Sequence, residues 1–234
     1  MTRERAEVLA RRGTWVTAVS LLLVAAVYVR ALAFTPIERF QGPAQKIFYV
    51  HVPAGWSMML GFLVTGILSV LYLWLKDRRL DMAAAASAEV GLAFGVVVLS
   101  SGPIWAKPIW GTWWTWDARL TSTLFTVLLF VGYQVLRGAM TDPDVRARYS
   151  AVIGVLALIL VPFIHMSVYL FRTLHPMPVV LKPGAPSLPG VMLATLLFSF
   201  GVFTLLYIGL FAQRYALGVL RDLRDQEAAS HALS

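Results

Sequence analysis

Residues 47–75 read IFYVHVPAGWSMMLGFLVTGILSVLYLWL and contain no Asp, Glu, Lys or Arg. A helix needs about 20 largely apolar residues to span a bilayer, and about 17 is the lower limit. Only 14% of the 234 residues are charged and 59% are hydrophobic, whereas about 25% of the residues in a soluble domain are charged. We therefore expect an all-α integral membrane protein, a bundle of six transmembrane helices that forms a single domain over residues 1–234. The other five charge-free stretches are residues 13–29, 90–106, 120–136, 149–171 and 184–213.

The Lys and Arg residues predict which side of the membrane each connection faces. Cytoplasmic connections carry an excess of these residues. Six spans place both termini on one side, together with the second and fourth connections, and thirteen of the 20 Lys and Arg residues fall there. We therefore expect both termini in the cytoplasm and the other three connections outside. A cleavable signal peptide ending at Ala31-Leu32-Ala33 is the alternative for the first span, although residues 13–29 exceed the usual apolar core of about 7–15 residues.

Five of the eight tryptophans lie within residues 105–116, between the third and fourth spans. Pro103 is expected to end the third helix, so that residues 104–117 form a tryptophan-rich outer loop. Tryptophan is common at membrane interfaces, but residues 110–117 read WGTWWTWD, which is far denser than an interfacial belt requires. Such a concentration of indole rings can cover one face of a large flat ligand. Asp117 is well placed to cap the fourth helix.

Two histidines lie where a helix meets the outer surface. His51 opens the second span, and His175 begins the third outer loop. Either residue alone is more often a polar cap, but two neutral imidazoles opposed across a gap form the axial ligand pair of a bis-histidine haem. His165 lies deeper in the fifth span, where it can bond to a neighbouring helix or ligate a second haem.

Cations on the outer side suit the propionates of such a haem. Arg119 is the first candidate, with Lys107 or Arg172 for the second propionate. The alternative for Arg119 is an interfacial arginine that pairs with Asp117.

The residue types that the chain lacks limit its chemistry. It has no Cys, so it forms no disulfide and cannot attach haem through a thioether. It has no phosphate-binding Gly-x-x-x-x-Gly-Lys-Ser/Thr loop, so another subunit must hydrolyse any ATP that the process consumes. The formal net charge of +8 is explained mainly by cytoplasmic Lys and Arg and requires no nucleic acid.

Two other functions compete with haem handling. A membrane redox protein of the cytochrome b type would need ligand pairs inside the bundle, where only His165 lies deep. A solute or ion transporter could use Glu89, the only carboxylate well inside a span, as a proton relay. We favour a structural hydrogen bond for Glu89, because few other polar residues occur along the spans.

Three segments resemble the motifs of one family. Residues 107–122, KPIWGTWWTWDARLTS, are similar to the tryptophan-rich signature of the WWD haem-handling membrane proteins, which include CcmC, CcmF and CcsA. Residues 51–53, HVP, and 172–176, RTLHP, resemble its two flanking histidine motifs. The short chain and its six spans resemble the smallest branch, CcmC, the haem exporter protein C of system I cytochrome c maturation. The resemblance covers residues 13–214.

The resemblance implies a function and a set of partners. His51 and His175 would be the axial ligands of a non-covalently held haem b on the periplasmic face of the bacterial inner membrane. The chain would pass this haem to the chaperone CcmE without altering it chemically, so that it would be a transport subunit and not an enzyme. The ATP-binding cassette pair CcmA and CcmB and the small subunit CcmD would complete the complex. The platform that holds haem and meets the chaperone would comprise Trp110, Trp113, Trp114, Trp116, Asp117 and Arg119.

Overall fold

The computed structural model describes residues 1–233, which are mainly helical, and the connection between residues 170 and 190 is the longest among them. Six helical segments are long and apolar enough to cross a membrane, which confirms the predicted six-helix fold. The fifth span consists of two helices in line. The helices are α1 (Arg3–Val29), α2 (Phe48–Leu75), α3 (Arg78–Trp110), α4 (Ala118–Ala139), α5 (Pro143–Val155), α6 (Ala157–Leu170) and α7 (Gly190–Leu233), with a π-helical turn at Arg30–Phe34 and a 3-10 turn at Pro43–Ile47.

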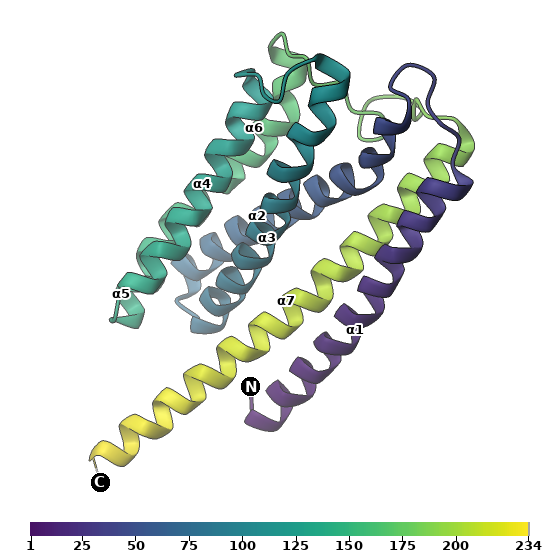
Figure 1. Ribbon diagram of the computed structural model, residues 1–234. Coiled ribbons are helices and arrows are strands. Elements are labelled where there is room, and N and C mark those ends of the chain that lie inside the picture. The colour runs from purple at the N-terminus through teal and green to yellow at the C-terminus, as the bar shows by residue number, and fades with distance from the viewer. Residues whose placement is uncertain (234) are drawn as a thin grey trace.

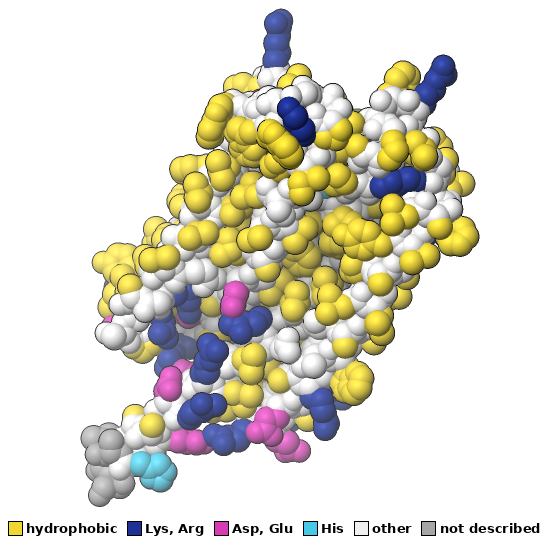
Figure 2. Space-filling model, in the orientation of Figure 1, with side chains coloured by type: hydrophobic (Ala, Val, Ile, Leu, Met, Phe, Trp, Pro, Cys, Tyr) yellow, Lys and Arg dark blue, Asp and Glu magenta, His cyan; other side chains and the backbone are white. Residues whose placement is uncertain are grey.

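The helices form three groups (Figure 1). The long helices α1 and α7 run side by side, α4 lies beside α5 and α6, and α2 and α3 lie between these two groups. Both termini lie at one end of the bundle, which we call the inner end; the opposite end, which carries the tryptophan-rich segment, is the outer end. In Figure 2 the charged side chains gather towards the inner end, and apolar side chains cover the middle of the bundle.

The helices approach most closely where glycines meet. A Cβ atom added to Gly61 of α2 would lie 2.8 Å from the Cα atom of Gly91 in α3. Small residues let backbones in a membrane pack this closely. The contact is reinforced by Ser87, whose hydroxyl donates to the Gly61 carbonyl at 2.7 Å. Beside it the rings of Phe62 and Phe130 stack at 3.9 Å between centroids, which joins α4 to the same core.

Ion pairs join the helices towards the inner end. Arg137 of α4 holds Asp81 of α3 through two hydrogen bonds of 2.6 and 3.0 Å, and both side chains are nearly buried. Glu89 of α3 accepts a hydrogen bond of 2.8 Å from Arg214 of α7. Glu89 therefore has the structural partner that we expected, and this partner is a cation.

Two predicted helix ends were wrong. Helix α3 continues through Pro103 to Trp110, because inside a membrane no water competes for the backbone groups and a proline costs one hydrogen bond without ending the helix. Gly111, in a left-handed conformation with its N–H bonded to the Lys107 carbonyl, ends α3 instead. The sixth span does not end with its charge-free stretch, residues 184–213, because helix α7 continues to Leu233.

Two other spans differ from the prediction in detail. Helix α2 begins at Phe48, so His51 lies in its first turn and Pro53 lies inside the helix. The fifth span is interrupted at Leu156, whose N–H donates to the carbonyl of Ile153, three residues earlier, and so tightens the turn. The expected cap at Asp117 is confirmed, because its carboxylate accepts from the backbone N–H groups of residues 119 and 120.

Candidate functional site

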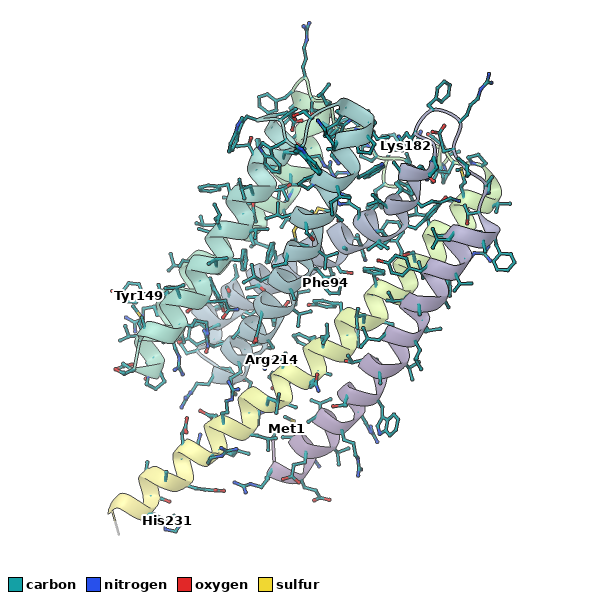
Figure 3. All side chains as sticks on the ribbon, viewed as in Figure 1. Met1, Phe94, Tyr149, Lys182, Arg214 and His231 are labelled. Carbon is teal, nitrogen blue, oxygen red and sulfur yellow. The ribbon has the colours of Figure 1, made fainter. Side chains whose placement is uncertain are left out.

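The outer end contains a cavity of about 200 Å³. A single water needs roughly 10–15 Å³ by this measure, so the cavity has room for a ligand. Helices α2, α3, α4, α6 and α7 line it, and the connection between α6 and α7 contributes residues 175–181. His231 is far away, near the inner end of α7 (Figure 3). The polar and aromatic lining residues named from the sequence are His51, His165, His175, Arg119, Trp110 and Trp114.

His51 is held by the first turn of α2 against α3. Its Nδ1 atom lies 2.9 Å from the hydroxyl oxygen of Ser101. That hydroxyl donates its own hydrogen to the Val97 carbonyl at 2.6 Å, so it must accept from the imidazole. Nδ1 therefore carries the proton, and the lone pair of Nε2 is available to a metal. Gly102 gives the ring room, because a Cβ atom there would lie 3.2 Å from Cε1 of His51.

His175 is held by the connection after α6. Its Nδ1 atom lies 2.9 Å from the Pro176 carbonyl oxygen, which can only accept a hydrogen bond, so Nε2 again has the free lone pair. The ring meets that of Trp110 edge to face, at 6.5 Å between centroids. Burial, reinforced by the charge of Arg119, lowers the pKa of His175 from 6.5 to about 3. The imidazole is therefore neutral at physiological pH, which is the form that ligates metals.

Arg119 brings a cation to the cavity from the first turn of α4. The capping carboxylate of Asp117 is occupied by the backbone of this turn and by the hydroxyl of Thr115 at 3.1 Å. The guanidinium instead donates to the Ile164 carbonyl of α6 at 3.4 Å. A guanidinium has five N–H donors in a planar fork, which suits a carboxylate ligand.

The tryptophan-rich segment divides into two sets. Trp110, on the last turn of α3, and Trp114 line the cavity. Trp113 and Trp116 face outward and are 58% and 77% exposed. The ammonium group of Lys107 lies over the Trp113 ring, 6.0 Å from its centroid, and donates to the Gly111 carbonyl.

Lys107 and Arg172 are exposed and do not line the cavity. Of the three cations that the sequence offered for propionates, the structure therefore brings only Arg119 to the histidines.

Several residues around the histidines were not predicted to contribute to the site. Trp105 meets the edge of the His51 ring at 5.6 Å between centroids and donates its indole N–H to Gln41 at 3.2 Å. Its position became relevant only because α3 continues through Pro103. Ser101 and Gly102 look like ordinary small residues of a membrane helix, and their roles depend on the neighbouring helix. Trp56 also lines the cavity, but it lies five residues after His51, which is about 140° around the helix, so the spacing gave no signal for it.

Comparisons with known proteins identify the family of this chain. Residues 2–230 match the family described as "Heme exporter protein C", abbreviated CcmC. Heme exporter protein C of Bradyrhizobium diazoefficiens is 39% identical over 86% of this chain and 76% of its own length. The proteins of the same name from Haemophilus influenzae and Escherichia coli K12 are 35% and 34% identical, over 87% and 69% of this chain and 82% and 66% of their own lengths. The chain therefore belongs to the CcmC family, as its tryptophan and histidine motifs predicted.

Proposed function

We propose that this chain binds haem at its outer end and exports it for cytochrome c maturation, with His51 and His175 as the two axial ligands. One observation carries the proposal: both imidazoles line one cavity, and each has its Nδ1 proton bonded to the protein so that Nε2 is free for iron. The description of the family as haem exporters supports haem as the cargo.

The two ligands differ in how firmly they are held, which suits a reversible grip. His51 lies on a helix and is oriented by Ser101 of the next helix. His175 lies in the long connection between α6 and α7, bonded to its own neighbours. Because the chain has no cysteine, it holds haem b by coordination and stacking alone. We infer that release begins when the connection moves His175 away from the iron.

The remaining residues of the site contact either the haem or the protein that receives it. Arg119 pairs with a haem propionate, and the rings of Trp110 and Trp114 cover the porphyrin from the cavity wall. The exposed rings of Trp113 and Trp116 form a surface for a haem chaperone of the CcmE kind. In this proposal CcmA and CcmB supply ATP hydrolysis, a CcmD-like subunit joins the complex in the bacterial inner membrane, and the site faces the periplasm. The chain thus acts as a transport subunit and not as an enzyme.

An absorption spectrum of the purified protein tests the ligands. His51→Ala and His175→Ala should each lose the bis-histidine Soret band and the ability to load the chaperone, whereas His231→Ala should retain both. His165 lines the same cavity and is the competing ligand, so His165→Ala belongs in the same series. Full haem content in both the His51 and the His175 variants would contradict the proposal. Loss in His165→Ala with retention in His175→Ala would transfer the ligand role to His165.

A further inference from the structure

The cavity extends well below the histidines. On α2 it is lined by Val52, Gly55, Trp56 and Met59, and Met59 lies eight residues, or about 12 Å of helical rise, deeper than His51. This lower part is apolar and lies within a transmembrane segment. The cavity therefore continues from the histidine site into the hydrocarbon region of the bilayer.

Hydrogen bonds, an ion pair and a ring contact join α3 and α7 in their deeper parts. Among the described residues, they are joined by the ion pair of Glu89 with Arg214, by the hydrogen bond of 2.7 Å between Ser87 and Tyr207, and by the rings of Phe94 and Phe203 at 6.1 Å. The two ribbons diverge towards the outer end, with the start of α2 between them (Figure 1). At that level they both line the cavity, through Leu99 and Pro103 of α3 and Leu196 and Phe200 of α7.

Where α3 and α7 diverge, Trp56 of α2 contacts α7. The indole N–H of Trp56 donates to the hydroxyl of Thr204 on α7 at 3.1 Å. Its ring meets Phe200 edge to face at 6.1 Å between centroids. The gap between α3 and α7, which we call the seam, is thus lined by the side chains of Trp56 and Phe200, and Figure 2 shows apolar side chains over this part of the bundle.

We propose that this seam is a lateral portal through which haem passes between the outer leaflet and the histidine site, with Trp56 as its gate; the inference rests on the proposed function. Haem is flat and apolar except for two carboxylates, so it dissolves in a leaflet with the carboxylates at the water interface. A portal just below that interface admits the ring edge-on while the carboxylates travel at the level of Arg119. Opening requires the loss of one hydrogen bond and a rotation of the indole, with no separation of packed helices.

The cysteine-free chain allows the portal to be blocked at a single position. In the protein reconstituted in lipid, Thr204→Cys, which lies beside Trp56 but does not line the cavity, is labelled with a bulky maleimide, and the Soret band is followed after mixing with phosphatidylcholine vesicles that contain haem. We expect uptake to slow by about tenfold, which corresponds to a barrier higher by about 1.4 kcal/mol, while the final Soret amplitude is unchanged. Ile67→Cys, an exposed position on α2 nearer the inner end, carries the same label as the control and should take up haem at the normal rate.

The second variant weakens the gate without blocking it. Thr204→Val keeps the shape and removes the acceptor for Trp56, so uptake should accelerate by about threefold, the effect of a typical interhelical hydrogen bond in a membrane. An unchanged rate in labelled Thr204→Cys, or equal slowing by the label at Ile67, would overturn the portal. Absence of any bis-histidine Soret band in the unlabelled protein would instead refute the proposed function.

Discussion

The outer and inner ends of the bundle use the same kinds of residue for different purposes. Near the inner end the charges of Asp81 and Arg137 face each other, and in the middle of the bundle Gly61 brings two backbones together. At the outer end Arg119 and His51 face a cavity, and Gly102 makes room for an imidazole. Polar groups in a membrane are costly unless they are paired, so the inner end is built for stability and the outer end for a polar ligand that completes it.

The largest effect that we expect concerns the inner end alone. Asp81→Asn leaves the nearly buried guanidinium of Arg137 without a counter-charge, which should lower the free energy of unfolding by about 3–5 kcal/mol. Thermal unfolding in detergent measures the loss. Asp144→Asn, which alters an exposed carboxylate, is the control. The comparison of the two ends would fail if Asp81→Asn shifted the Soret band of the protein that remains folded, because the inner end would then contribute to the site.

A smaller effect distinguishes two neighbouring serines at the outer end. Ser101→Ala removes the group that orients His51, and loss of such a partner to a metal ligand should weaken haem affinity by about tenfold. Ser100→Ala removes an exposed hydroxyl that bonds only to carbonyls of its own helix and should change nothing. Haem titration of both variants provides the measurement. Equal affinities for the two would show that the hydrogen bond does not position the imidazole.

The smallest expected effect concerns haem affinity, which should change little with pH. Because the pKa of His175 is lowered to about 3, protons do not compete with iron for this ring until the pH is far below 6.5. In His51→Ala, which leaves the His175 site, residual haem affinity should change by less than about twofold between pH 7 and pH 5. An ordinary imidazole would lose about tenfold per pH unit below 6.5, and that result would contradict the burial of His175.

The lowered pKa of His175 also makes the stability of the fold depend on pH. The direction of this dependence is opposite to that produced by a salt-bridged histidine, whose pKa is raised. The unfolded chain binds a proton at His175 near pH 6.5, whereas the folded chain does so only near pH 3. The stability that comes from keeping this ring neutral is therefore complete above pH 6.5 and is lost progressively as the pH falls towards 3. The free energy of unfolding of His175→Ala, measured across this pH range, should lack the part of the decrease at low pH that comes from this ring.

Much of the fold was predictable because it depends on local properties. Six charge-free stretches identified the spans, and the aspartate before the fourth span identified its cap. The errors occurred where tertiary or solvent context overrides a local signal. Pro103 would end a helix in water, but α3 continues for two turns, and this extension places Trp105 and Trp110 on a helix beside the histidines.

The sequence by itself determined that this chain spans the membrane six times, that it belongs to the CcmC family and that histidines and indoles concentrate at one end. These follow from hydropathy and from short motifs, which act over a few neighbouring residues. Only the tertiary structure decided that Trp110 and Trp114 face the cavity while Trp113 and Trp116 face outward, and that Arg119 rather than Lys107 or Arg172 reaches the histidines. It also decided that Ser101 sets the tautomer of His51. The reason is that such contacts join residues from different helices, and their distances depend on how far each helix extends and on which face it packs.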